Sequence, residues 1–519
     1  MKKVRVLAWI LVLAFILSAC GGSSSGTTAA PKPGESTEAP SPSGEKKKDI
    51  TILMPSDITG FDPWAASSVY NQLVLWQMYD RLYELDEDKK PSPQLTKEAK
   101  MISDTEWEIK IKEEAKFSDN TPLTSKDVAA SITRGIESGL GGAIFKPLQS
   151  CEVIDEHTVK ITTATPYPQL PVALCQLIAC IVPADYLAQA TSSGDWSNPI
   201  GSNRYKFGSR IPGTSVTLVR NENYWNPADA AKNESLTYKI VPEASTRTIM
   251  IQTGEADLSS EFSTADMEIV KNDDKVKVYS HKSSVMVFMP LNCEYEPFTH
   301  KEVRQALNFA ISRDNVLLVN ANGYGVTNYT YLSPTCYGWL DNPSGYSYNV
   351  DKAKELLKQA GYEGGFSFDL YVTQAFTAAG TQIQSDLKAI GITVNIKMME
   401  SLDDVVKLAS DGAHAMITTW GANPEPTLVL PRLVGESALG AYNLAHYVNP
   451  ELEALWAGGY ASQDVNDRIP YYKQWQEILC EDCPWVPLYV GELFCLATAD
   501  LQGVQMNTEQ IFKLHELHY

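Results

Sequence analysis

The chain has 519 residues, which at roughly 150 residues per domain predicts about three domains or subdomains. Acidic residues outnumber basic residues 63 to 43, which gives a formal net charge of −20, and no Lys/Arg-rich arm stands out. Because nucleic-acid binding depends on basic groups that neutralise phosphates, this balance argues against a nucleic-acid partner.

The N-terminal segment has the form of an export signal. A short basic start precedes an apolar run over residues 6–17, which is shorter than the roughly 20 residues that span a bilayer. Leu17-Ser18-Ala19-Cys20 follows and resembles the lipobox of bacterial lipoproteins, in which the chain is cut before the cysteine and a diacylglycerol is attached to its sulfur. The resemblance implies a lipoprotein signal peptide over 1–19 and a lipid anchor on Cys20. The alternative is an ordinary secretion signal with an incidental cysteine.

Residues 20–48 are rich in Gly, Ser, Thr, Pro and Ala and contain no large apolar side chain. Such a segment cannot build a core, so we expect a disordered tether between the lipid and the body. No later run of 18 or more apolar residues occurs, so no further membrane span is expected. The protein is therefore expected to be exported and held on the outer face of the cell membrane, which is the periplasmic side if the host has an outer membrane.

The body, from residue 49 to 519, alternates between strand and helix patterns, which indicates an α/β fold. Strands are predicted over 49–55, 106–112, 157–163, 215–220, 236–241 and 392–396. Helices are predicted over 69–85, 124–136, 244–254, 299–311, 351–360, 383–390 and 466–479, with Thr299 and Glu302 forming a capping box.

Candidate chemistry in the body is sparse. No nucleotide-binding, serine-hydrolase or zinc-protease motif is present, so no catalytic residue, cofactor or metal is expected. His515-Glu516-Leu517-His518 is predicted to be a solvated tail. Cys480 and Cys483 have C-x-x-C spacing without a second pair, so this spacing favours a local disulfide or free thiols over zinc. Whether the eight cysteines beyond Cys20 pair with one another stays open.

Six segments, in order along the body, resemble the bacterial extracellular solute-binding proteins of family 5, the peptide- and nickel-type receptors of ABC importers. They include Phe117-Ser118-Asp119, Gly254-Glu255-Ala256-Asp257 and Ala360-Gly361-Tyr362. The full set lies at 107–134, 220–225, 254–257, 297–313, 351–362 and 484–489. Two departures are Asn120, where the family usually has Gly, and Gly201-Ser202-Asn203-Arg204-Tyr205, where it often has Gly-Thr-Gly-Pro-Tyr.

The resemblance implies an α/β, two-lobed, periplasmic-binding-protein-like fold of type II with an extra subdomain in the first lobe. The first lobe is expected at 49–69, 197–285 and 488–519, its inserted subdomain at 70–196, and the second lobe at 286–487. Two chain crossings would then form a hinge about which the lobes close on a ligand as nearly rigid bodies.

The resemblance also points to a ligand site in the loop over residues 418–426. In peptide receptors of this family a Trp in the similar loop borders the cleft, and an Asp after it holds the peptide α-ammonium. Here Trp420 is the matching aromatic, Asn423 is the nearest match to the Asp, and Glu425 is the nearest carboxylate. Because a buried ammonium needs an anion, either the cargo lacks a free α-ammonium or Glu425 replaces the Asp. Further cleft candidates, in predicted loops or beside the altered Gly201 segment, are Trp64, Asn203, Tyr205 and Trp339.

These features predict a monomeric, lipid-anchored receptor that captures an oligopeptide or similar solute and delivers it to the permease subunits of an ABC importer. An oligosaccharide or a metal chelate is the alternative cargo. A secreted hydrolase or a surface sensor is the alternative from another functional class.

Overall fold

The computed structural model describes residues 47–66, 68–86, 90–138, 142–400, 404, 407–408, 411–421, 424–460, 462–507 and 512–519. The chain divides into two units, residues 1–46 and 47–519, and the first lies outside the described residues, as do the predicted signal peptide and Cys20. Lys47 and Lys48, the last two residues of the predicted tether, are bound to the body, since Lys47 pairs with Asp257 at 2.8 Å and Lys48 with Glu234 at 3.1 Å. None of the helices described is both long and apolar enough to cross a membrane.

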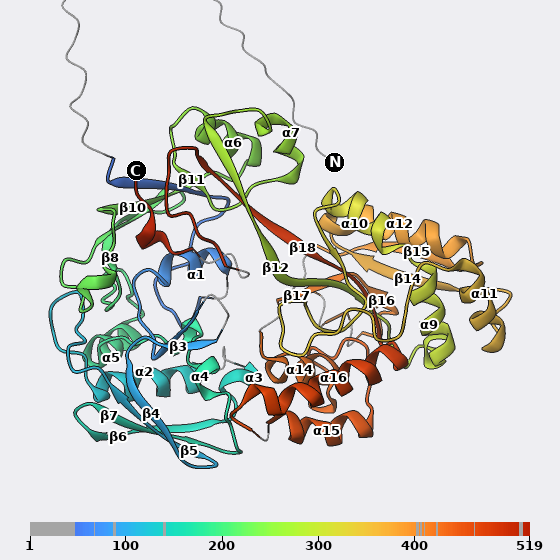
Figure 1. The fold of residues 1–519 in the computed structure, drawn as a ribbon, viewed down its shortest axis with the longest axis horizontal. Coiled ribbons are helices and arrows are strands. Elements are labelled where there is room, and N and C mark those ends of the chain that lie inside the picture. The colour runs from blue at the N-terminus through green and yellow to red at the C-terminus, as the bar shows by residue number, and fades with distance from the viewer. Residues whose placement is uncertain are drawn as a thin grey trace, which may run out of the picture. The chain divides into compact units, whose positions relative to one another are not determined.

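A nine-stranded sheet forms the centre of the body (Figure 1). Its strand order is β17-β12-β18-β11-β1-β10-β9-β8, and β13 pairs with β18 beside this path. Strand β1 pairs in parallel with both β10 and β11, and four of its six residues are buried, as expected for a central strand covered on both faces. The bounds are β1 Asp49–Met54, β8 Tyr205–Ile211, β9 Ser215–Arg220, β10 Ser235–Ile240, β11 Leu258–Ser259, β12 Val276–Pro290, β13 Gly325–Thr327, β17 Thr418–Gly421 and β18 Trp485–Thr498.

The long antiparallel strands β12 and β18 link two hydrophobic cores. One core gathers residues of β1, β9, β10 and the C-terminal end of β18, and it defines the first lobe. A second core gathers residues of β12, β14 and the N-terminal end of β18, and it defines the second lobe. The pairing of β12 with β18 shifts register between Lys282 and Met286 and again between Val287 and Phe288. The lobe boundaries predicted from the sequence, at 285/286 and 487/488, lie on these two strands and stay predictions.

The inserted subdomain is a four-stranded antiparallel sheet in the order β4-β5-β7-β6, with α2 packed against it. In β5, Trp107, Ile109 and Ile111 are buried and alternate with more exposed residues, the pattern of a half-buried strand. The bounds are β2 Tyr83–Leu85, β3 Pro91–Pro93, β4 Thr96–Ser103, β5 Glu106–Ile111, β6 Leu148–Asp155, β7 Thr158–Thr163, α2 Ser125–Ser138, α3 Gly142–Phe145, α4 Leu170–Ala173 and α5 Ala184–Ser193.

The helix predicted over 69–85 is shorter than expected. Helix α1 spans only Val69–Leu75, and Tyr83–Leu85 forms the strand β2 paired with β3. Between them Arg81 forms a bridge with Cys180, and Ile181 N–H donates to the carbonyl of Asp80. Backbone pairing with residues far along the chain therefore overrides the local helical pattern.

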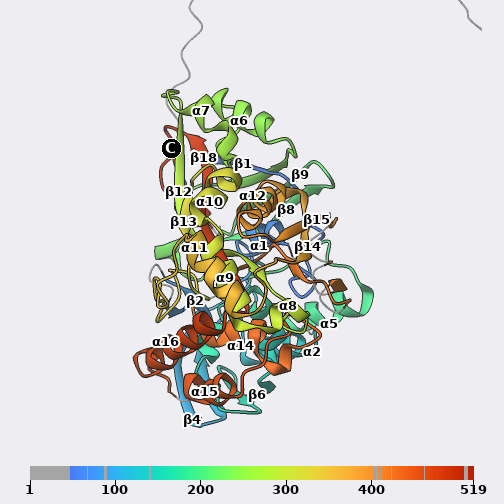
Figure 2. The same ribbon diagram turned by 90° about the vertical axis from the view of Figure 1, so that its right-hand side faces the viewer.

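The second lobe contains a parallel sheet in the order β15-β14-β16, and helix α12 packs beside β14 and β15 (Figure 2). Helix α9 begins at Lys301 with His300 as N-cap and no side-chain cap bond, because Thr299 donates to the carbonyl of Glu296 instead, so the predicted capping box is wrong. The remaining bounds are β14 Ser367–Val372, β15 Thr393–Met398, β16 Ala415–Met416, α6 Ala244–Gln252, α7 Met267–Val270, α8 Glu296–Thr299, α9 Lys301–Ala310, α10 Arg313–Ala321, α11 Val350–Gln359, α12 Thr377–Lys388, α14 Leu430–Val434, α15 Pro450–Tyr460 and α16 Val465–Asp482.

The structure gives a local reason for Asn120, which departs from the family pattern, and for Gly201, which keeps it. Asn120 has a φ of 72°, a left-handed conformation that Asn tolerates better than most residues, and its side chain accepts from Lys116 Nζ at 2.9 Å. Gly201 lies so close to the backbone of Met78 that an added Cβ would come within 2.0 Å of the Met78 carbonyl oxygen. Asn120 thus replaces the usual glycine without a change in the turn, and the glycine at 201 is required by close approach.

The C-terminal segment is not the solvated tail that the sequence predicts. Leu514 and Leu517 belong to the first-lobe core and are 0% and 1% exposed. The buried Asn233 donates to the carbonyls of both leucines, at 2.8 and 3.0 Å. This segment therefore closes the first lobe.

Candidate functional site

The predicted ligand loop begins beside the register shift between the lobes. Strand β17 is the edge strand of the large sheet, and its Trp420 and Gly421 pair with Met286 and Val285 of β12. These two β12 residues follow directly on the irregularity that starts after Lys282. Trp420 is half-buried at the edge of the apolar cluster that contains Met286 and Val490. The sequence-predicted Trp420 is thus anchored by backbone pairing at the point where the strands pass from one lobe to the other (Figure 1).

The other end of this loop contacts the inserted subdomain. Leu428 is 4% exposed and belongs to the same apolar cluster as the subdomain residues Phe145 and Leu170. Nearby, the buried Gln169 at the start of α4 donates from Nε2 to the Gly459 carbonyl of α15 at 3.2 Å. The chain from Trp420 to Leu428 therefore leads from the hinge strands to a surface shared by the two lobes.

Glu425 lies within this stretch but is fully buried. Its carboxylate pairs with Arg468 Nη2 at 2.5 Å and accepts from Thr427 Oγ1 at 3.1 Å and from the hydroxyl of Tyr472. Burial opposes ionisation of Arg468, yet the charge of Glu425 raises the pKa of the guanidinium above its ordinary value. A ligand ammonium could reach this carboxylate only by displacing Arg468. Asn423, the other predicted charge-site residue, lies outside the described residues.

Sequence reasoning missed a cluster that forms around Trp420. The Arg432 guanidinium of α14 lies 5.2 Å from the centre of the Trp420 ring and 5.6 Å from that of Tyr442, and the two rings meet edge to face with centres 5.2 Å apart. Burial lowers the pKa of Arg432. The three residues are separated by 12 and 10 positions along irregular chain, so no helical or strand period in the sequence indicated their meeting. We call them the Trp420 cluster.

Trp339 lies on the same lobe. It is half-buried against the apolar cluster that also includes Trp420, and its indole Nε1 is buried with no hydrogen-bond partner among the described residues. The backbone N–H of its near neighbour Tyr337 donates to the Pro424 carbonyl at 2.9 Å. The loop that carries Trp339 therefore braces the start of the Glu425 segment.

The three candidates from the first lobe are held in its core. Trp64 is 3% exposed and its indole N–H donates to the Ile178 carbonyl at 3.0 Å. Asn203 donates to the Trp76 carbonyl at 2.8 Å, and the buried Tyr205 hydroxyl donates to Asn233 Oδ1 at 2.7 Å. Their polar groups are thus satisfied within the lobe, and a ligand role for them stays a prediction.

Six of the described cysteines are free thiols: Cys151, Cys180, Cys293, Cys480, Cys483 and Cys495. All but the half-buried Cys293 are buried. Burial raises the pKa of Cys480 to about 12, which makes its thiol unreactive at neutral pH. Asp229, His515 and Glu516 offer ligand atoms within 4.8 Å of one another, but Arg204 already pairs with Asp229, and Lys232 with Glu516 at 2.6 Å. Two cations thus already occupy the position that a metal ion would need.

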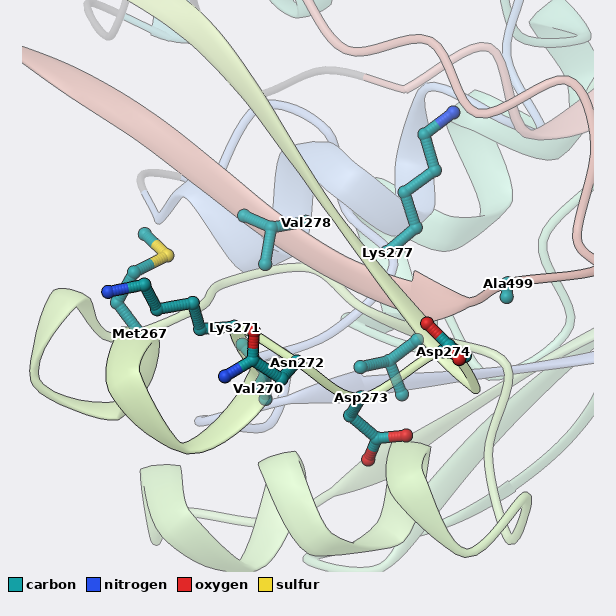
Figure 3. Close-up of a pocket in the computed structure, with 10 residues that line it drawn as sticks. Met267, Val270, Lys271, Asn272, Asp273, Asp274, Lys277, Val278 and Ala499 are labelled. Carbon is teal, nitrogen blue, oxygen red and sulfur yellow. The ribbon is translucent and has the colours of Figure 1, made fainter.

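A surface hollow of about 520 Å³ lies away from the Trp420 cluster, between α7 and the start of β12 (Figure 3). Its charged lining includes Lys271 and Lys277 together with Asp273 and Asp274. All of its lining residues belong to 267–278 or to Ala499, so it is a feature of the first lobe alone.

Comparison with known proteins agrees with this architecture. The glutathione-binding protein GsiB of Escherichia coli K12 is 26% identical over 473 residues, which cover 88% of this chain and 91% of GsiB. The structure of HbpA2 from Haemophilus parasuis superposes with a TM-score of 0.82 at 22% identity, covering 90% of this chain and 99% of HbpA2. A dipeptide-binding protein from Pseudoalteromonas sp. SM9913, in complex with Met-Leu, gives a TM-score of 0.77 at 22% identity over 90% and 99% of the two chains.

The family model for the bacterial extracellular solute-binding proteins, family 5 (middle part), matches residues 90–438. This match covers more than half of the chain, including most of the inserted subdomain, the strand β12, and Trp420 and Arg432. The two-lobed α/β fold is shared with the solved structures above. The chain therefore belongs to the bacterial extracellular solute-binding proteins of family 5.

Proposed function

We propose that this protein is the lipid-anchored receptor of an ABC importer, and that it captures a peptide between its two lobes and delivers it to the permease. The observation that carries the proposal is the course of the Trp420–Leu428 stretch. It starts at the hinge strands and ends against the inserted subdomain, so a solute bound beside it would contact both lobes. Family membership supports the receptor role.

Peptide cargo is supported by the names of the similar proteins. GsiB binds glutathione, a tripeptide, and the Pseudoalteromonas protein holds Met-Leu. In this chain an aromatic and guanidinium cluster lies beside the register shift between β12 and β18, and such rings offer stacking area for peptide groups. No reaction is proposed, because a receptor must release its cargo unaltered.

The test is calorimetric titration of residues 47–519 with glutathione, dipeptides and tripeptides, followed by chromatography of the recovered ligand. We expect one peptide per chain, recovered intact. A peptide at 100-fold its Kd should stabilise the folded state by about 2.7 kcal/mol and raise the melting temperature. Cleavage of the peptide would indicate an enzyme. If no peptide binds but an oligosaccharide or a metal chelate does, the proposed peptide cargo is wrong.

A further inference from the structure

Arg432 is a half-buried cation whose donors are left open. Its guanidinium lies against the rings of Trp420 and Tyr442, at 5.2 and 5.6 Å from their centres, and these contacts use the guanidinium face. None of the described residues forms a hydrogen bond or an ion pair with Arg432. The planar fork of N–H donors at its edge, which suits a carboxylate, is thus unoccupied by the described chain.

Arg468 and Arg313 are buried arginines that are paired, whereas the buried Arg81 lies over the Trp76 ring with its Nε and Nη1 unpartnered among the described residues. Arg468 pairs with Glu425 at 2.5 Å. Arg313 donates from Nε to the carbonyls of Pro487 and Asn328, at 2.8 and 3.0 Å. Carboxylates are not scarce in a chain with 63 acidic and 43 basic residues. Without a paired carboxylate, the desolvation of the Arg432 cation has a cost that the two rings offset only in part.

The cluster lies beside the register shift of β12 and is partly exposed. Trp420 pairs with Met286 beside the register shift of β12, and Tyr442 is 43% exposed, so the cluster is open to solvent on one side. Glu425, the carboxylate nearest to Trp420 in the sequence, is already bound to Arg468, and Glu436, four positions after Arg432, forms no ion pair with it among the described residues. Among the described residues, the charge offered by this cluster is therefore positive.

We propose that the Arg432 guanidinium receives a carboxylate of the cargo through its open edge, while the Trp420 and Tyr442 rings hold its plane. This inference rests on the proposed function and gives it a substrate class: peptides with a free carboxylate at this point. The carboxylate comes either from the peptide C-terminus or from an acidic side chain. A charge-assisted, two-pronged contact of this kind fixes both the position and the orientation of the cargo.

The experiment is calorimetric titration of the wild type, Arg432→Gln and Arg432→Lys. The probes are Ala-Ala-Ala and its C-terminal amide, and Ala-Glu-Ala-amide and Ala-Gln-Ala-amide. Arg220→Gln, a substitution at a half-buried arginine of β9 in the first lobe, is the matched control. Melting temperatures establish that each variant is folded. If Arg432→Gln does not fold, the comparison is made with Arg432→Lys.

We expect Arg432→Gln to weaken binding of the preferred carboxylate probe at least tenfold, with Arg432→Lys intermediate and Arg220→Gln unchanged. In the wild type, the probe without the carboxylate should bind much more weakly than the probe that has it. In Arg432→Gln the two probes should bind equally. The comparison of Ala-Ala-Ala with its amide tests whether Arg432 binds the C-terminal carboxylate. The comparison of Ala-Glu-Ala-amide with Ala-Gln-Ala-amide tests whether it binds an acidic side chain. An equal difference between the two probes in wild type and variant overturns this inference and leaves the proposed function standing, whereas a wild type that binds no peptide overturns both.

Discussion

At the scale of single residues, the pair of Glu425 and Arg468 is the strongest buried interaction near the site. Their side chains are 1% and 5% exposed. Glu425→Gln would leave Arg468 buried without a charge partner, and breaking a buried pair in this way costs about 3–5 kcal/mol. We expect a matching fall in the free energy of unfolding, measured by urea denaturation.

The control for this prediction is Asp185→Asn, which removes the exposed pair between Asp185 and Lys126 and should leave the urea midpoint unchanged. The double variant Glu425→Gln/Arg468→Met should recover part of the lost stability, because no buried charge remains. A Glu425→Gln midpoint equal to that of the wild type would show that the pair is not buried as described.

Asn120 provides a second test at this scale. An Ala at its φ of 72° would place Cβ too close to the following carbonyl, at a cost of roughly 1–2 kcal/mol, whereas Gly has no such penalty. We therefore expect Asn120→Ala to lower the melting temperature and Asn120→Gly to stay near the wild type. Asn272→Ala, at an exposed Asn outside the left-handed region, is the control and should have little effect. Equal melting temperatures for Asn120→Ala and Asn120→Gly would contradict the left-handed turn.

Single residues of the site were only partly predictable. Trp420 was proposed because it lies in a recognisable stretch, which the structure shows to be strand β17, and its ligand role stays a prediction. Arg432 and Tyr442 could not be proposed, because they are distant in sequence and meet only through the turns on either side of α14. The role of Glu425 was also hidden, since its partner Arg468 lies 43 positions away on another helix.

At the scale of secondary-structure elements, the strands and helices with a clear period were predicted well. The buried positions of β5 and the apolar side of α9 follow the periods of two and 3.6 residues. The prediction of a helix over 69–85 was wrong at its C-terminal end. There β2 forms by pairing with β3, and the local sequence pattern does not indicate this pairing. The sequence predicted only that the chain crosses twice between the lobes. The structure shows that long strands, β12 and β18, make these crossings.

The contact of α4 with α15 makes a prediction at the same scale. The buried Gln169 donates to the Gly459 carbonyl at 3.2 Å, between the inserted subdomain and the second lobe. Gln169→Met keeps the side-chain length but removes the donor, so the form with the lobes in contact should lose about 1 kcal/mol. We expect the ligand-free variant to show a larger radius of gyration in small-angle X-ray scattering.

Gln189→Met, at an exposed position of α5 within the subdomain, is the matched control and should scatter like the wild type. If Gln169→Met and Gln189→Met give the same radius as the wild type, this hydrogen bond does not help to hold the lobes together.

At the scale of the whole molecule, the lipobox-like stretch predicts how the receptor is held. Cys20→Ala should remove the acylated sulfur, so labelled fatty acid is expected to enter the wild type and not the variant. Cys151→Ala, a change at a buried thiol of the body, is the control and should keep the label. Equal labelling of wild type and Cys20→Ala would show that the anchor lies elsewhere or does not exist.

The most direct test of the whole account is native mass spectrometry of the protein purified from its host under conditions that keep ligands bound. The account predicts a one-to-one complex with a small peptide that carries a free carboxylate and is released with unchanged mass on denaturation. A bound oligosaccharide or metal chelate, or a peptide recovered in pieces, would contradict it.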